Sequence, residues 1–327
     1  MSARTLRPIT QALADLTISD PASAGNLSVY PLLARHDHEP AYLTLDQALA
    51  KGFVRVTEVS EAGSVPTLLV KNAGPQPVLI LDGEELVGAK QNRIVNLTIL
   101  VPAATTLTIP VSCVEAGRWA ARSHAFAPAG RAHYASGRAM KLRQVTASLR
   151  EKGARFADQA AVWHDISAKA ARMEASSETS AAAAMSERRR GELEALEDRL
   201  QALPGQVGAI FAIDGVVAGL DLFDCAATWR RSMRKLVQSY GLDALDLAGS
   251  TRGDGLPDVR RFLEAVTDSS ADAYAALGLG TDVRFESRAL RGAALVVDDR
   301  VVHLLAFPAA GHAESGWPRR SRRPSAF

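Results

Sequence analysis

The feature that most constrains the fold is a change of hydrophobic pattern near residue 134, which reverses near residue 205. Before residue 120, apolar residues come in short runs of strand length, separated by turn-forming residues. Between 134 and 203 they recur at three- and four-residue spacing, which is typical of amphipathic helices. Runs of strand length then return. This order predicts an α+β fold with antiparallel sheets, roll- or sandwich-like, in both halves and a helical insertion between them.

The same pattern predicts a single domain over residues 15–308. Its expected parts are a β-rich segment at 25–120, the helical insertion at 134–203 and a mixed β/α segment at 205–308. In the last segment a helix is expected to begin near residue 226 and to end at Gly241. Residues 1–14 and 309–327 are predicted to be flexible tails, since chain ends are poorly ordered unless they are tied down.

Composition narrows the class of protein. A net charge of +2 over 327 residues gives no strong attraction to nucleic acid or to a membrane surface. No apolar run approaches the roughly 18 residues of a membrane helix, and the N-terminus lacks the apolar stretch of a secretion signal. The two cysteines, Cys113 and Cys225, form no CxxC pair and no disulfide framework. We therefore expect a cytoplasmic protein.

Three segments with similar patterns are predicted to form β-hairpins. They read PVLILDGEELVGA at 77–89, GAIFAIDGVVAGL at 208–220 and GAALVVDDRVVHL at 292–304. Each has an apolar run, a turn that begins with Asp, and a second apolar run. Duplication and common hairpin chemistry explain this likeness equally well. Only the first copy leads into a dense block of polar residues, which directs attention to residues 82–119.

Residues 82–119 are the predicted site, because they combine carboxylates, amides, a guanidinium, a thiol and an indole between two apolar runs. The candidates for acid–base or nucleophilic chemistry are Glu84, Glu85, Glu115 and Cys113. The candidates for binding a ligand are Gln91, Asn92, Arg93, Arg118 and Trp119. Because side chains alternate along a strand, at most one of Glu84 and Glu85 can face a given cleft.

Each candidate also has a structural interpretation. Glu84 and Glu85 suit a solvated turn, and the amide–Arg block suits a buried network that satisfies loop backbone. Glu115 and Arg118 can form a structural ion pair beside an anchored indole. A lone cysteine at a strand end is often a small buried hydrophobe, whereas a nucleophile needs a base such as His124 or His133. These alternatives stay open at this point.

No metal site is predicted. His36 and His38 have the chemistry of metal ligands and a spacing that suits one face of a strand, but no second His or Cys cluster accompanies them. A surface loop is the preferred interpretation. Asp221 and Asp224 are interpreted as a strand end and a helix N-cap. No phosphate-binding loop, Rossmann fingerprint or nucleophile elbow occurs, so no particular cofactor is indicated.

Several long strings resemble the ARPP-1 family, whose name stands for ARG- and rhodanese-phosphatase-superfamily-associated protein domain. They are GEELVGAKQNRIVN, IPVSCVEAGRW, GRAHYASGRAM and PGQVGAIFAIDGVVAGLDLFD, and the resemblance extends from about residue 15 to 307. ARG denotes ADP-ribosylglycohydrolase, so the resemblance implies a place in ADP-ribose or nucleotide-related processing and an association with such proteins. It identifies no reaction. Eight candidate residues coincide with the family's motifs: Glu84, Glu85, Gln91, Asn92, Arg93, Cys113, Glu115 and Trp119.

The main hypothesis is a protein that binds, and in one version processes, a nucleotide-derived or phosphorylated ligand such as ADP-ribose. In this hypothesis Arg93 or Arg118 meets phosphate, Trp119 stacks, and Glu84 or Glu115 acts as acid or base. A second hypothesis is a non-enzymatic scaffold whose polar block contacts another protein. A third is a hydrolase that uses Cys113 as its nucleophile.

Overall fold

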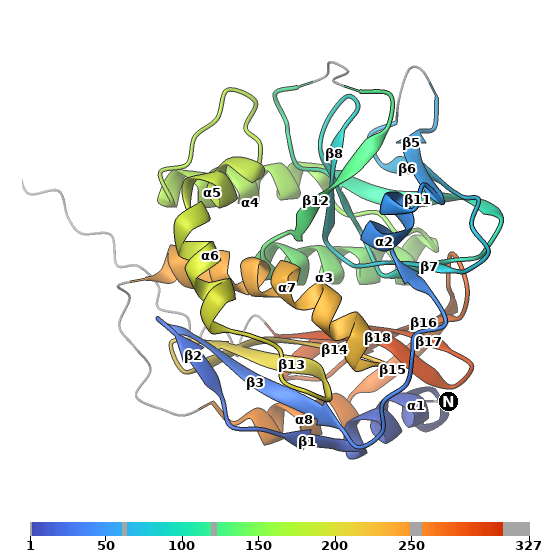
Figure 1. Ribbon diagram of the computed structural model, residues 1–327, viewed down its shortest axis with the longest axis vertical. Helices are drawn as coiled ribbons and strands as arrows, with labels where there is room; N and C mark the ends of the chain where they lie inside the picture. Colours follow the sequence, from blue (N-terminus) through green and yellow to red (C-terminus); the bar gives the residue numbers. More distant parts are fainter. Residues whose placement is uncertain (1, 61–63, 119–122, 249–256, 310–327) are drawn as a thin grey trace, which may run out of the picture.

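Two β-structures, a closed barrel and a large open sheet, lie on either side of a layer of helices (Figure 1). The computed structural model describes residues 2–60, 64–118, 123–248 and 257–309. The predicted α+β class, with antiparallel sheets in both halves and a helical segment between them in the chain, is confirmed. None of the described helices has both the length and the apolar character needed to cross a membrane.

The open sheet has nine strands, all antiparallel. Eight lie in the order β1-β3-β13-β14-β18-β17-β16-β15, and β2 pairs with β3. Their bounds are β1 Leu16–Ile18, β2 Ala22–Ala24, β3 Leu27–Ala34, β13 Gln206–Ile213, β14 Val216–Phe223, β15 Ser270–Ala275, β16 Thr281–Glu286, β17 Leu290–Val297 and β18 Arg300–Pro308. Strand β3 pairs with β13, so the start of the predicted 25–120 segment belongs to the C-terminal sheet.

The barrel closes in the order β11-β6-β5-β12-β8-β9. Its strands are β5 Val54–Glu58, β6 Thr67–Asn72, β8 Glu84–Gly88, β9 Arg93–Val95, β11 Thr105–Cys113 and β12 Phe126–Ala132. A small sheet of β4 Leu43–Thr44, β7 Val78–Ile80 and β10 Ile99–Val101 adjoins it, with helix α2 Leu45–Ala50. Val56, Val70 and Ile109 are fully buried in the shared core, because inward-facing positions of a small barrel are filled by side chains.

The prediction of a β-hairpin at residues 77–89 is wrong. β7 pairs with β4 and β10, whereas β8 pairs with β9 and β12. The chain passes at Asp82-Gly83 from the small sheet into the barrel, and Gly83 has a φ of 76° there. A Cβ at this glycine would lie 2.8 Å from Cγ of Arg138, so a buried side chain occupies the space beside the turn. The second and third hairpins, β13–β14 and β17–β18, are confirmed.

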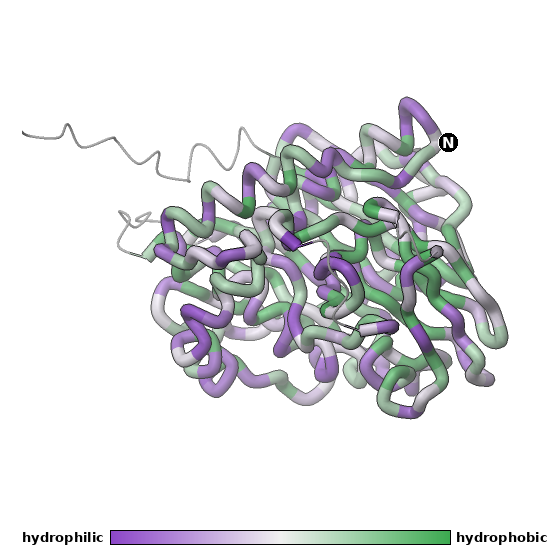
Figure 2. The backbone as a smooth tube through the Cα atoms, turned by 90° about the horizontal axis from the view of Figure 1, so that it is seen from above, coloured by the Kyte–Doolittle hydropathy of each residue, from purple (hydrophilic) through white to green (hydrophobic). Residues whose placement is uncertain are grey.

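The helices cover both faces of the open sheet. Their bounds are α1 Ser2–Ala14, α3 Ala135–Lys152, α4 Gln159–Arg172, α5 Ala183–Arg188, α6 Arg190–Arg199, α7 Ala226–Leu247 and α8 Val259–Thr267. Helices α3 and α7 lie between the sheet and the barrel, and α1 and α8 lie on the opposite face of the sheet (Figure 1). Hydrophobic and hydrophilic residues alternate along the chain (Figure 2), as elements with one buried face require.

Helix α7 runs past Gly241, where it was predicted to end. This glycine serves close packing instead. A Cβ on Gly241 would lie 2.9 Å from Cδ1 of Leu196 on α6. The two helices therefore approach each other so closely that a larger residue would displace the Leu196 side chain.

The N-terminal segment is a helix rather than the flexible tail predicted for residues 1–14. Leu6, Ile9 and Leu13 of α1 are buried in a core cluster with residues of the open sheet and α8. Their three- and four-residue spacing puts them on one face of the helix. Residues 310–327 of the predicted C-terminal tail lie outside the described residues.

Truncation of Ile9 tests whether α1 is part of the cooperative fold. Ile9 is 0% exposed, so Ile9→Ala should lower the free energy of unfolding by about 2–5 kcal/mol, as buried Ile-to-Ala changes do. The matched control is Gln11→Ala at an exposed position of the same helix, which should stay within about 0.5 kcal/mol of the parent. Urea denaturation measures both, and equal small effects would contradict the docking of α1.

Candidate functional site

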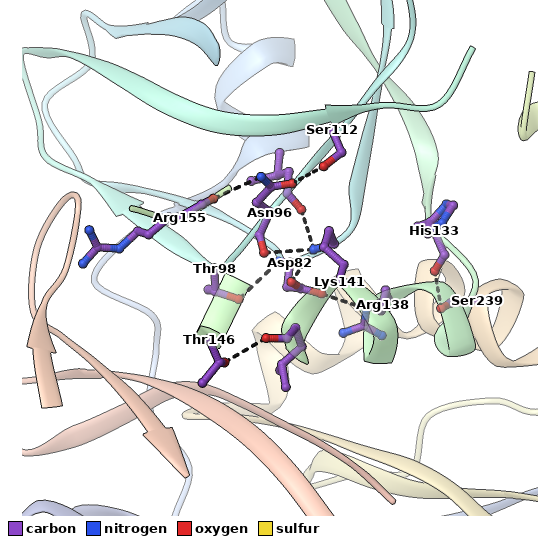
Figure 3. Close-up of polar contacts among 12 residues, drawn as sticks. Asp82, Asn96, Thr98, Ser112, His133, Arg138, Lys141, Thr146, Arg155 and Ser239 are labelled. Atoms are coloured by element: carbon purple, nitrogen blue, oxygen red, sulfur yellow. Dashed lines mark hydrogen bonds and ion pairs between the residues drawn. The ribbon is translucent and has the colours of Figure 1, made fainter. Parts of the chain in front are cut away.

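A network of buried charges joins the barrel side of the molecule to the open sheet through α3. Figure 3 shows the end of this network at Asp82, which faces Arg138 and Lys141. The Asp82 carboxylate accepts hydrogen bonds from Nε of Arg138 at 3.2 Å and from Nζ of Lys141 at 2.6 Å. The same guanidinium donates through both terminal nitrogens to Asp221 on β14, at 3.2 and 2.6 Å. Arg138 therefore links carboxylates from two separate β-structures while being fully buried.

All three N–H donors of the Lys141 ammonium are engaged in hydrogen bonds. The ammonium donates to Asp82 and, at 2.9 Å each, to the carbonyl oxygens of Val95 and Asn96. Burial lowers the pKa of Lys141 to about 8, against the opposing effect of Asp82. Three bonds to three fixed acceptors leave this group no proton directed at a ligand. Its role is to fasten α3 to the barrel.

Asp221 was expected to be a simple strand end and is instead the centre of the network. Besides Arg138, it accepts from the Tyr240 hydroxyl at 2.8 Å, and its Oδ1 lies 3.2 Å from Nε2 of His303. Burial alone would raise the pKa of Asp221, but Arg138 and His303 outweigh it and lower the pKa to about 2. A buried carboxylate held by this many donors stays ionised.

The sequence-predicted residues around 91 and 115 come together in a second buried cluster. Glu115 accepts from Arg118 at 2.6 Å, from the backbone N–H of Asn92 at 3.1 Å and from the Thr179 hydroxyl at 2.9 Å. Burial opposes ionisation of Glu115, but these donors prevail and lower its pKa. The carboxylate therefore fixes the segment that contains Asn92 against the turn at 115–118.

The other members of this cluster bond to one another and to the backbone. Arg118 donates to the Ala89 carbonyl at 2.7 Å and to Oδ1 of Asn92 at 3.1 Å. Gln91 donates to the Glu115 carbonyl at 2.9 Å and accepts from Arg93 at 3.0 Å. The five predicted residues Gln91, Asn92, Arg93, Glu115 and Arg118 thus share one buried cluster.

Glu84 and Glu85 lie apart from that cluster and from each other. Glu84 accepts from the Leu81 N–H at 3.0 Å and from the Lys235 ammonium on α7. Glu85 forms a two-pronged pair with Arg131 on β12, at 2.6 and 3.1 Å. The alternation of side chains along β8 produces this separation. The eight candidates within the described residues therefore do not converge on one pocket.

Cys113 is fully buried at the end of β11, and its Sγ donates to the Glu115 carbonyl at 3.5 Å. Burial raises the pKa of this thiol, so near neutral pH it carries its proton. A nucleophilic cysteine needs the opposite shift. Trp119, the remaining candidate, lies outside the described residues.

A cavity of about 320 Å³ lies between α3, α4, α7 and the strands β14, β17 and β18. Its apolar wall includes Met140, Leu142 and Phe307. Its polar groups are Ser136, Arg143, Asp165, Asp243 and Arg291. An apolar wall with a few converging polar groups is the usual composition of a small-molecule site.

Two carboxylates in this cavity have contrasting surroundings. Asp243 accepts from the N–H of Ser136 at 2.6 Å, from its hydroxyl at 2.7 Å and from the Lys169 ammonium at 2.7 Å. Asp165 accepts from the Tyr134 hydroxyl at 2.7 Å, and burial raises its pKa, with the charge of Asp243 adding to the effect. Unequal environments for two nearby carboxyl groups are typical of acid–base pairs.

Sequence reasoning missed Asp165 and Asp243. Both lie on amphipathic helices, where a charged residue normally marks the solvated face. Only the tertiary packing of α3 between α4 and α7 brings them to one cavity. A helical pattern in one sequence carries no signal for that convergence.

The buried His133 predicts a pH effect on stability. Burial, and then the charges of Lys141, Lys169 and Arg138, lower its pKa to about 3. Because the unfolded chain binds a proton near pH 6.5 and the folded chain does not, stability is lost as pH falls from about 6.5 towards 3. His133→Asn should remove this dependence. The parent should lose about 1.4 kcal/mol per pH unit more than the variant between about pH 6 and 4, measured by urea denaturation; parallel curves would contradict the assignment.

Removal of the Lys141 ammonium tests the role of the buried network. Lys141→Met leaves the Val95 and Asn96 carbonyls and part of Asp82 without a donor, so it should cost about 3–5 kcal/mol of unfolding free energy. Lys152→Met changes an exposed lysine of the same helix and should cost under about 0.5 kcal/mol. If the two variants had equal stability, the network would not fasten α3.

Comparison with known proteins gives one result. No curated protein and no solved structure matches the chain. A family model described as ARG and Rhodanese-Phosphatase-superfamily-associated Protein domain matches residues 15–307. The match includes both β-structures and the helices between them, and it confirms the resemblance carried by the long sequence strings. The chain belongs to the ARPP-1 family.

Proposed function

We propose that this protein binds a nucleotide-derived, phosphorylated ligand, with ADP-ribose as the first candidate, in the cavity between α3, α4, α7 and the open sheet. The observation that carries the proposal is the combination of two guanidiniums, two carboxylates and an apolar wall around about 320 Å³. This volume lies in the lower part of the range for small-molecule sites. It suits one nucleoside phosphate unit, and the rest of a larger ligand extends along the open side.

Each part of such a ligand has a matching group. Arg143 is exposed at the cavity and makes no ion pair within the described segments, so its guanidinium is free to meet phosphate. Arg291 adds a second positive charge, shared with Glu286 at 3.4 Å. Phe307 and Met140 offer apolar surface to a base.

Asp165 is the acid–base candidate if the ligand is processed. Its raised pKa favours the protonated carboxyl group, which can donate to a leaving oxygen. The family name supports this ligand class, since ARG denotes ADP-ribosylglycohydrolase, and a protein of that type is the partner the name suggests. The two free, buried cysteines suit the cytoplasmic setting of such chemistry.

We assign the cluster of Gln91, Asn92, Arg93, Glu115 and Arg118 a structural role in this scheme. Its carboxylate, amides and guanidiniums hold the segment at 88–93 against the turn at 115–118. Groups engaged with one another must break those bonds before they meet a ligand, at a cost of about 1–3 kcal/mol for each buried group left unsatisfied. The raised pKa of Cys113 likewise disfavours the thiol hydrolase.

Calorimetric titration tests the proposed function. The full chain should bind ADP-ribose or AMP, and Arg143→Gln combined with Arg291→Gln should weaken binding at least about tenfold, since each charge-assisted bond contributes about 1.5–3 kcal/mol. Arg188→Gln, an exposed arginine on α5 that does not line the cavity, should leave affinity unchanged. The absence of binding at millimolar ligand would overturn the proposal.

Asp165→Asn separates binding from chemistry. The amide keeps the size of the carboxyl group but cannot donate the same proton. If the protein cleaves ADP-ribosyl compounds, this variant should lose turnover by about 100-fold or more while retaining the ligand affinity of the parent. Turnover equal to that of the parent would exclude Asp165 as the acid.

A further inference from the structure

A second constellation, remote in sequence from the predicted site, lies where the loop at 35–39 meets the start of α7. Ligand atoms of His38, Asp224 and Cys225 all lie within 4.8 Å of one another. His38 Nε2 and Asp224 Oδ2 are 3.4 Å apart. Two ligands on bonds of about 2.0–2.1 Å with a tetrahedral angle are separated by about 3.4 Å, so this pair already has the spacing of metal ligands.

Within the described residues, the Asp224 carboxylate has no Arg or Lys partner. The Asp224 side chain is only 3% exposed, and in the described ranges His38 is the only basic side chain within 4.0 Å of it. Other buried carboxylates of the described segments, such as Asp82 and Asp221, have Arg or Lys partners. Buried charges in proteins are paired or coordinate metals. The environment of the Asp224 carboxylate therefore favours a bound cation.

The histidine presents its nitrogen to the group. His38 Nε2 is itself inaccessible to solvent and makes no hydrogen bond, although the side chain as a whole is 31% exposed. The ring therefore has one edge in solvent and its ligand nitrogen directed inward. A buried imidazole nitrogen without a hydrogen-bond partner needs an explanation, and a metal ion supplies one.

Neighbouring groups hold the three ligands in place. Asp37 accepts from the N–H of Ala226 at 3.0 Å, which docks the loop of His38 on the first turn of α7. The Tyr42 hydroxyl donates to Oδ1 of Asp224 and lies 2.9 Å from the Thr228 hydroxyl. Hydrogen bonds to the non-coordinating atoms of a ligand set are the usual support of a metal site.

We infer that His38, Asp224 and Cys225 form a binding site for a divalent transition metal of the zinc type. Imidazole, carboxylate and thiolate are all zinc ligands, and three protein ligands leave one position for water or another ligand. A cavity of about 400 Å³ lined by His36, His38, Asp224 and Arg300 lies beside the group, so the fourth position is open to solvent. This site is distinct from the proposed nucleotide cavity.

Zinc titration of the full, tag-free chain after treatment with a chelator tests the inference. The expected result is one Zn²⁺ per chain with a dissociation constant below about 1 µM. About one proton should be released to the buffer on binding, because the Cys225 thiol coordinates as thiolate. Calorimetry in two buffers of different ionisation enthalpy measures that proton.

Variants and a second metal make the test specific. Cys225→Ser and His38→Ala should each weaken Zn²⁺ binding at least about 100-fold, whereas His124→Ala, an exposed histidine remote from this group, should bind as the parent does. Co²⁺ bound to the parent should show a sulfur-to-cobalt charge-transfer band that Cys225→Ser abolishes. Thermal melts without metal identify any variant that fails to fold.

Three outcomes would overturn the inference: no saturable Zn²⁺ binding at micromolar concentrations, Zn²⁺ affinity unchanged in folded Cys225→Ser, or a Co²⁺ complex of the parent without the sulfur band. The Co²⁺ spectrum needs no variant, so it decides the question even if a substitution unfolds the chain. Failure of Zn²⁺ binding leaves ADP-ribose binding intact, because the two sites share no residue.

Discussion

The relative placement of the two β-structures depends on one guanidinium. Arg138 on α3 is fully buried between Asp82, at the entrance to the barrel, and Asp221, in the middle of the open sheet. An ion pair of this kind adds little net stability over apolar packing, but it penalises any arrangement that leaves one partner alone by about 3–5 kcal/mol. Two β-structures that could slide on an apolar interface are thereby held in one position, and Lys141 adds a second fixed point on the same helix.

The geometry of both proposed sites depends on this fixed placement of the two β-structures. Helix α3 supplies Ser136 and Arg143 to the nucleotide cavity, on the same helix that Arg138 and Lys141 hold in place. Helix α7 begins at the His38–Asp224–Cys225 group and reaches the cavity at Asp243. Between these points Lys235 bonds to Glu84 in the barrel, and Tyr240 bonds to Asp221 in the open sheet. A ligand at either end of α7 is thus bound to an element that the core already fixes.

Local chemistry predicted the elements of this fold, and tertiary packing decided their partners. Alternation and turn residues identified β13–β14 and β17–β18 as hairpins, because those turns are closed by residues near in sequence. The same signals failed at Asp82-Gly83, where both flanking strands pair with distant segments. Gly241 was predicted to stop α7 because sequence alone does not distinguish a glycine that ends a helix from one that admits a neighbouring helix.

The densest block of polar residues is not where we propose that a ligand binds, and the reason is physical. The block around Gln91 and Glu115 is dense because a buried turn needs many donors and acceptors, and those groups engage one another. A site must instead keep bonding capacity in reserve: a carboxylate without a cation, a ring nitrogen without a hydrogen bond, or a guanidinium that faces a cavity. Asp224, His38 and Arg143 have that property, and it depends on partners that are absent within the described structure, which no local sequence pattern can reveal.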